Sequence, residues 1–76
     1  INLYPNPVKN TIHLNFNSLQ TNVNIDVINV LGQKVLSKYF GKINQTDLIL
    51  NLKKGIYLVR IKGDNNLNFI KKIIKQ

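Results

Sequence analysis

Apolar and polar residues alternate with a period of two in several short runs along the chain. Ile12, Leu14 and Phe16 alternate with polar neighbours, and the same pattern recurs over 23–27 and 47–52. Such alternation gives an extended strand one apolar and one polar face, as a half-buried antiparallel strand requires. No segment shows the 3.6-residue period of a convincing amphipathic helix. The pattern therefore predicts an all-β protein.

Turn-forming residues separate these runs. They are Pro5-Asn6-Pro7, Gly32, Gly41, Lys53-Lys54-Gly55 and Gly63-Asp64-Asn65-Asn66. The runs between them predict seven short strands, at about 1–4, 11–16, 23–30, 34–40, 47–52, 56–62 and 67–75. Seven strands at spacings near ten residues predict a small antiparallel β-sandwich. The run 56–61 is apolar on both faces apart from Arg60, which indicates a central strand.

Length and composition are those of one small domain, residues 1–76, which we expect to be a fragment of a larger chain because it begins at Ile1 and not at Met. The hydrophobic content of 43% is too high for a disordered tail. No signal peptide and no run of 18 apolar residues is present, so we expect no transmembrane segment. The absence of Cys excludes disulfides and thiolate metal sites.

The net charge of +8, from 11 basic and 3 acidic residues, allows two interpretations. It would attract an anionic partner such as nucleic acid, lipopolysaccharide or an acidic protein. It would equally follow from a composition bias toward Asn, Ile and Lys, in which Lys is the default solubilising residue. Nucleic-acid binding would need aromatic side chains stacked on a basic face, and only Tyr39 lies near lysines in a suitable place. We therefore predict no nucleic-acid partner.

Residues for catalysis or metal binding are sparse. The only histidine, His13, is expected to point outward from the second strand, and Asp26, Asp47 and Asp64 lie in different elements. Nucleophilic or acid–base catalysis needs a nucleophile, a base and an orienting group within reach. One His and scattered carboxylates do not have metal-ligand spacing, and no Gly-rich loop precedes a helix. We predict a protein without enzymatic activity, catalytic residues, metal or cofactor.

Two motifs constrain the backbone. In "YPNPVKNTI", Pro5 and Pro7 fix two φ angles, Asn6 can form an Asx-type turn, and Tyr4 can bury its ring at a wet edge. In "NVLGQKV", Gly32 lies between two apolar runs and is expected to need a positive φ in a hairpin.

Two further motifs lie toward the C-terminus. In "LKKGIYLVRI", Gly55 frees a turn and Tyr57 is expected in the core. The last stretch, "NFIKKIIKQ", predicts a basic strand that carries three lysines and no acid. Each of the four motifs is a weak indication alone, whereas their order and spacing are more specific.

Taken together, the four motifs resemble the type A C-terminal sorting domain of the type IX (Por) secretion system of Bacteroidota. The resemblance covers the whole chain and implies an Ig-like β-sandwich at the end of a larger secreted protein. It also implies passage through the periplasm and across the outer membrane. A sortase-like cysteine protease at the cell surface then commonly removes the domain and attaches the cargo to anionic lipopolysaccharide. The family motifs fall on Tyr4, Pro5, Asn6 and Pro7, on Gly32, on Gly55, Ile56 and Tyr57, and on the segment from Lys71 to Lys75.

The function expected from this resemblance is that of a secretion signal, recognised by the outer-membrane machinery while an N-terminal cargo domain is exported to the cell surface or the medium. We expect recognition through the segment Lys71, Lys72, Ile73, Ile74 and Lys75. A terminal strand with a free edge offers backbone groups for pairing, and its lysines can orient a partner. The alternative is an accessory Ig-like module that supports a neighbouring catalytic domain or binds glycan.

Overall fold

The computed structural model describes all 76 residues and contains strands and no helix. The strands are β1 (Asn2–Tyr4), β2 (Thr11–Ile28), β3 (Lys34–Ile49), β4 (Gly55–Lys62) and β5 (Asn68–Lys75). The all-β prediction is confirmed, whereas the prediction of seven strands is wrong, because the structure has five. No part of the structure has the helical length and apolar character needed to cross a membrane as a helix.

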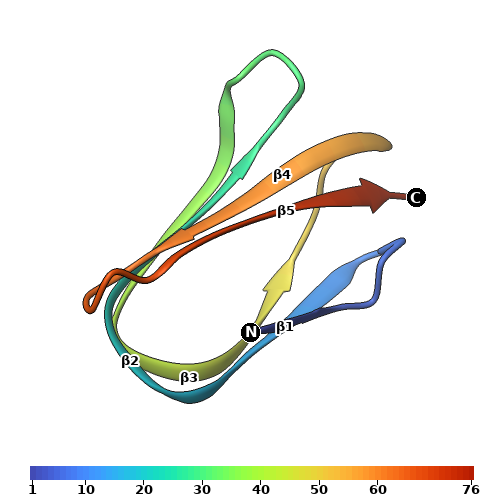
Figure 1. Cartoon of the computed structure of the whole chain (residues 1–76). Coiled ribbons are helices and arrows are strands. Elements are labelled where there is room, and N and C mark those ends of the chain that lie inside the picture. Colours follow the sequence, from blue (N-terminus) through green and yellow to red (C-terminus); the bar gives the residue numbers. More distant parts are fainter.

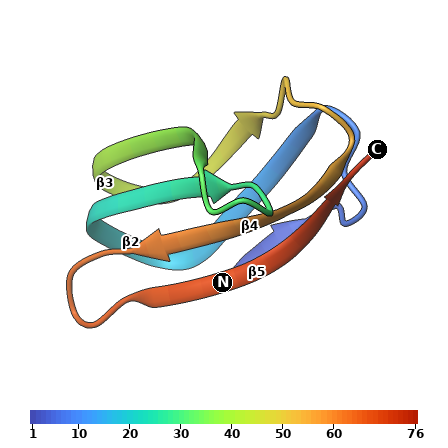
Figure 2. The same cartoon turned by 90° about the horizontal axis from the view of Figure 1, so that it is seen from above.

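All five strands belong to one antiparallel sheet that curls on itself (Figure 1). The strand β2 is central, because its first part pairs with β1 and β3 and its last part pairs with β3 and β4. The strand β4 lies between β2 and β5, as the apolar run 56–61 predicted. Seen from above, β4 and β5 run side by side along one side of the molecule (Figure 2).

Two of the predicted breaks between strands, at 17–22 and 41–46, lie at a corner where β2 and β3 bend together without ending. The β2–β3 register shifts between Asn15 and Gln20, so that β2 spends more residues on the bend than β3 does. Asn17 and Asn22 have positive φ angles of 66° and 52° there, and Asn tolerates this conformation better than most residues. The polar run 17–22 therefore makes a bend inside one strand and not a loop between two. Gly41, predicted to end a strand, lies inside β3.

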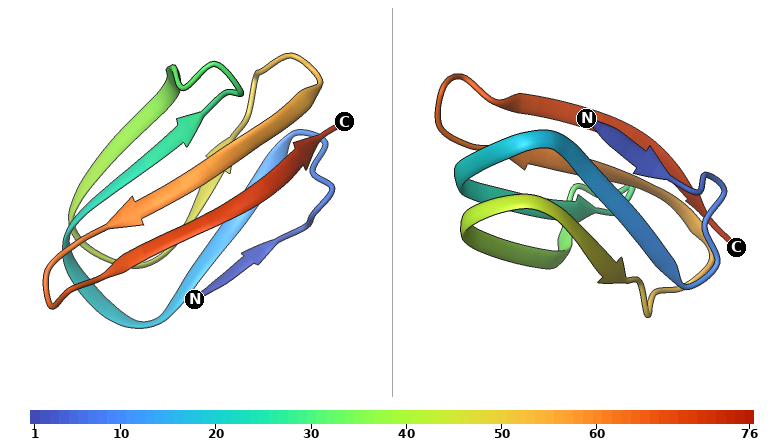
Figure 3. Two further views of the ribbon diagram at one scale, coloured as in Figure 1. Left: turned by 45° about the horizontal axis from the view of Figure 1, so that its top comes forward. Right: turned by 90° about the horizontal axis from the view of Figure 1, so that it is seen from below.

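The curl brings the two ends of the sheet together around one core (Figure 3). The core contains 15 buried apolar side chains, which come from all five strands and from the segments beside them. Burial alternates along these strands, as in β4, where Tyr57, Val59 and Ile61 point inward. The opposite face of β4 and β5 is partly open, since its apolar side chains are between 41% and 59% exposed.

The turn between β4 and β5 is attached to the β2 corner by Asp64. The Asp64 carboxylate accepts hydrogen bonds from the Thr21 hydroxyl at 2.7 Å and from the Asn22 side-chain amide at 2.8 Å. The backbone adds a bond from Asp64 N–H to the Thr21 carbonyl at 3.1 Å. The hairpin predicted from Gly63-Asp64-Asn65-Asn66 is thus present, and its acid fixes the hairpin to the bend.

Candidate recognition surface

Residues 71–75, which we call the basic segment, form most of β5, and their side chains point to the two faces of the sheet. The register pairs Gly55 with Lys75 and Tyr57 with Ile73. Ile73 is fully buried and Lys75 is 8% exposed, and the Lys75 ammonium donates a hydrogen bond to the Gln76 backbone oxygen at 2.9 Å. Lys71, Lys72 and Ile74 are exposed. Of the five expected recognition residues, these three present side chains to a partner.

The C-terminal half of β5 is covered at its edge by the loop that contains the two prolines. The Asn6 side-chain amide donates to the Lys72 carbonyl at 3.2 Å, and the Ile74 N–H donates to the Asn6 side-chain oxygen at 3.0 Å. Val8 continues the contact, because its N–H donates to the Ile74 carbonyl and its own carbonyl accepts from the Gln76 N–H, both at 2.8 Å. Val8 and Lys75 form a parallel bridge.

This arrangement gives the Pro-Asn-Pro motif a structural role that the sequence did not show. Proline has no N–H and cannot extend a ladder, so the side-chain amide of Asn6 takes the place of a backbone group between Pro5 and Pro7. The expectation of a free edge along the whole terminal strand is therefore wrong for residues 72–76. Backbone groups alternate along a strand, so those of Ile70 point to the same edge as those of Ile74, beyond the reach of the loop.

The residues of the other motifs lie in two turns, the one between β2 and β3 and the one that leads into β4. Gly32 has a positive φ of 82°, as predicted, and Gly55 has a φ of 154°. Asn29, which the sequence analysis did not single out, organises the Gly32 turn, since its side-chain oxygen accepts from the N–H groups of Leu31 and Gln33, each at 3.0 Å. Tyr57 is buried, as predicted, and its hydroxyl donates to the Lys53 carbonyl at 2.7 Å.

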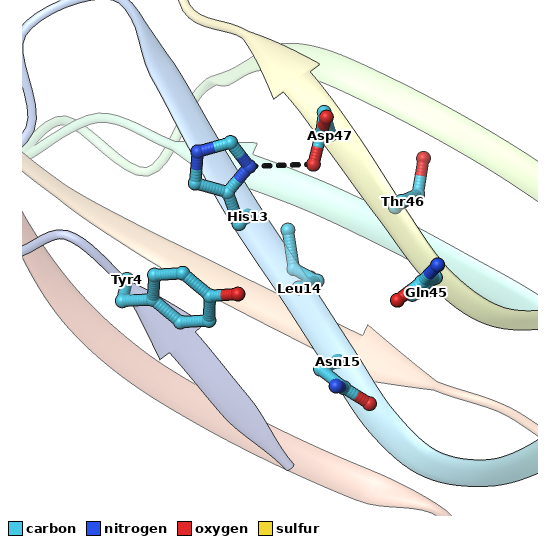
Figure 4. A pocket seen from close by; sticks show the side chains of 7 residues that line it. All are labelled: Tyr4, His13, Leu14, Asn15, Gln45, Thr46 and Asp47. Carbon is cyan, nitrogen blue, oxygen red and sulfur yellow. Dashed lines mark hydrogen bonds and ion pairs between the residues drawn. The ribbon is translucent and has the colours of Figure 1, made fainter.

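A polar pocket lies on the outside of β1, β2 and β3, where pairing places Tyr4, His13 and Asp47 in one row (Figure 4). His13 Nδ1 and the Asp47 carboxylate are 2.6 Å apart, and the rings of His13 and Tyr4 are 5.3 Å apart between centroids. Tyr4 is 52% exposed, so the expectation that its ring is buried is wrong. The pocket has a volume of about 420 Å³, and Leu14, Asn15, Gln45 and Thr46 complete its lining.

The chemistry open to this pocket is limited by its lining. The Asp47 carboxylate can orient the His13 imidazole, and the only side-chain hydroxyls among the lining residues are those of Thr46 and Tyr4. No group of three or more His, Cys, Asp or Glu residues in the structure is placed to hold a metal ion. The pair itself was missed from the sequence, because its members are 34 residues apart and meet only through the β2–β3 register.

The second polar cluster is centred on Asp26, on the outer face of β2. Its carboxylate accepts a hydrogen bond from the Ser37 hydroxyl at 2.7 Å and one from the Arg60 guanidinium at 3.2 Å, and Lys34 Nζ is 3.7 Å away. Burial raises the pKa of Asp26, but the hydrogen bonds from Ser37 and Arg60 and the charges of Lys34 and Arg60 outweigh it, so the pKa is lowered. The cluster neutralises the one acid of this face.

Comparison with protein families gives one match. The model described as the secretion system C-terminal sorting domain matches residues 2–76. No curated protein and no solved structure matches the chain. The matched range contains the proline loop, both glycine turns and the whole of β5.

Proposed function

The chain belongs to the family of type IX secretion C-terminal sorting domains, and on that premise we propose that it carries an attached N-terminal cargo domain through the periplasm and across the outer membrane. A sorting signal of this family implies export to the cell surface or the medium and contact with the secretion machinery. We propose further that a sortase-like cysteine protease at the cell surface removes the domain after export. The observation that carries the proposal is the family match over residues 2–76.

The basic segment is the proposed contact with the machinery. Lys71 and Lys72 are exposed, and no ion pair in the structure engages either. Ile74 adds an apolar side chain that is 44% exposed. Unpaired cations of this kind guide and orient an anionic partner more than they stabilise the fold.

A fused reporter in a Bacteroidota host tests the proposal. The wild-type fusion should reach the surface or the medium, whereas a fusion carrying Lys71→Gln and Lys72→Gln should accumulate in the periplasm with its sorting domain folded. The matched control is Lys38→Gln with Lys42→Gln, which removes the same charge from exposed positions on β3. Full export of the Lys71/Lys72 variant would contradict recognition by charge.

Deletion of residues 71–76 is a poorer test than substitution, because it also removes the buried Ile73 from the core. Failure of the wild-type fusion to leave the periplasm would contradict the export function itself. Proposed cleavage is followed in the same experiment by the size of the exported reporter, since removal of the domain shortens it by about the mass of this chain, 8.7 kDa.

Glycan binding by an accessory module is the second candidate, and the polar pocket is the observation that favours it. Tyr4 offers an exposed ring beside the polar side chains of Asn15 and Gln45. Aromatic rings combined with amide groups suit the apolar face and the hydroxyls of a sugar. Co-sedimentation with insoluble polysaccharide, compared between the wild type and Tyr4→Ala, tests this candidate separately from export.

A further inference from the structure

The outer face of β4 and β5 carries four apolar side chains at positions where a half-buried strand is normally polar. Ile56 and Leu58 of β4 and Ile70 and Ile74 of β5 point away from the core and are between 41% and 59% exposed. Ile56 pairs directly with Ile74 in the β4–β5 register, and Leu58 follows Ile56 on the same face of β4. Ile70 pairs with Arg60, and Lys72 lies between Ile70 and Ile74 on this face of β5. We call these four residues the outer apolar face. The run Ile56 to Ile61 is apolar on both faces apart from Arg60, and the core covers only the face that carries Tyr57, Val59 and Ile61.

A hollow lies at the end of this face beside the Gly32 turn. It has a volume of about 360 Å³ and is lined mainly by apolar residues, among them Ile28, Val30, Ile56 and Leu58. Val30 at its rim is 78% exposed. A hollow of this kind accepts one apolar side chain of a partner and supplies the central, dehydrated contact that dominates the affinity of many interfaces.

The charge around the outer apolar face is positive. Lys62 follows it on β4 and Lys72 lies opposite Leu58 on β5, and neither takes part in an ion pair. The one acid on this side, Asp26, is already held by Arg60, Ser37 and Lys34. A second copy of the chain would bring the same positive charge, and the net charge of +8 opposes that association.

We propose that the outer apolar face is a docking surface for a folded protein of the secretion machinery whose contact area has an apolar centre and carboxylates around it. The proposal rests on the sorting function and names a surface that includes β4, beyond the basic segment. A lipid surface fits the geometry less well, because these side chains are only 41% to 59% exposed and are partly covered by their neighbours, whereas insertion between lipids needs protruding apolar side chains.

The test replaces three residues that lie outside the basic segment. Ile56→Thr, Leu58→Thr and Ile70→Thr together keep strand-compatible side chains on β4 and β5 while removing apolar surface. The matched control, Leu19→Thr with Ile49→Thr, changes apolar residues that are 62% and 75% exposed elsewhere on the sheet. Each variant is fused to the same reporter as the wild type and produced in the same Bacteroidota host.

We expect the surface-exposed and released reporter to fall by roughly tenfold or more in the triple variant, as when central interface residues are truncated, and to stay unchanged in the control. Normal export of a folded triple variant would overturn the docking surface and leave the sorting function standing. Retention of the wild-type fusion would instead contradict the sorting function on which the proposal rests.

Two further measurements cover the remaining outcomes. If the triple variant unfolds in a urea titration, Lys62→Glu decides, because it leaves the apolar residues in place. A retained Lys62→Glu reporter beside an exported Lys42→Glu control supports the docking surface, and export of both overturns it. Binding of the purified domain to phosphatidylglycerol vesicles, lost in the triple variant, would overturn a protein partner in favour of a lipid surface.

Discussion

At Gly32 and Gly55 the backbone conformation, and not a lack of space for a side chain, limits which residue types fit. Both have positive φ angles, yet a Cβ atom built at either would meet nothing within 4 Å. We predict that Gly32→Val and Gly55→Val each lower the free energy of unfolding by about 1–3 kcal/mol, the usual cost of a strained backbone. Gly41→Val is the control, since Gly41 also has open space but lies in β3 without a positive φ. An equal loss in the control would show that strain is not the cause.

The Asp26 cluster predicts how stability depends on pH. The folded pKa of Asp26 lies below the unfolded value near 3.8. The ionised carboxylate therefore favours the folded state at pH values above the unfolded pKa, and this stabilisation is lost as pH falls through the folded pKa. We expect the urea midpoint to fall from about pH 4 downward, and to fall less in Asp26→Asn.

Near neutral pH, Asp26→Asn itself should cost about 1–3 kcal/mol, because it weakens two hydrogen bonds to a nearly buried charge and leaves Arg60 without its counterion. Asp47→Asn provides the comparison, since the Asp47 side chain is 65% exposed. Exposed pairs contribute little, so this change should leave the midpoint nearly unchanged. Equal effects of the two substitutions would contradict the structural role given to Asp26.

At the scale of whole elements, the two-residue alternation predicted strand type well and strand ends poorly. The alternating apolar residues of segments 11–16 and 23–27 predict strands, and both segments lie in β2. The polar residues between them looked like a loop because a bend in a strand and a loop between strands use the same residue types. Only the pairing with β3, which continues on both sides of the register shift, shows that β2 is a single strand.

Contacts between elements could not be predicted, because they depend on register. Asn6 and Ile74 are 68 residues apart, and Asp26 and Arg60 are 34 apart. No local pattern links such positions in a single sequence. The Gly32 turn was predictable for the opposite reason, since a positive φ is a local requirement that favours Gly. The outer apolar face could be predicted in part. The sequence shows that its β4 residues belong to an apolar strand, but it does not show that no other part of the chain covers them.

The clamp between the proline loop and β5 leads to a prediction at this scale. Asn6→Ala removes both hydrogen bonds that the Asn6 side chain makes to β5. We expect a loss of about 1–2 kcal/mol in the free energy of unfolding and faster amide hydrogen exchange at Ile74, whose N–H loses its acceptor. Asn51→Ala changes an exposed side-chain amide that makes no hydrogen bond to β5, and it should leave Ile74 exchange unchanged. Unaltered exchange at Ile74 in Asn6→Ala would show that the Asn6 side chain does not hold the edge of β5.

Asn6→Ala also frees the Lys72 carbonyl and the Ile74 N–H at the edge of β5, while the Val8 hydrogen bonds to Ile74 and Gln76 stay in place. An uncovered edge strand can pair with another chain, so the Asn6→Ala variant should form more dimers at high protein concentration than the wild type does. Sedimentation velocity measures this directly. If the proposed recognition through β5 holds, the same opening would offer the machinery a longer edge for pairing.

For the whole molecule, the single core predicts that the two ends of the curled sheet unfold together. The buried cluster joins Ile12, near the start of β2, to Ile61 of β4, and both are fully buried. A core of this size supports a stability of only about 3–5 kcal/mol, so conservative changes are needed to keep the variants folded. Ile12→Val and Ile61→Val should each lower the free energy of unfolding by about 0.5–1.5 kcal/mol.

Tyr4 lies in β1 and Tyr57 in β4, so single-tyrosine variants that keep one or the other report on the two ends of the sheet separately. If the sheet is one cooperative unit, each Val substitution lowers the midpoint seen by both tyrosines equally. A shift confined to the tyrosine nearer the substitution would show that the curled sheet contains two units with separate stabilities.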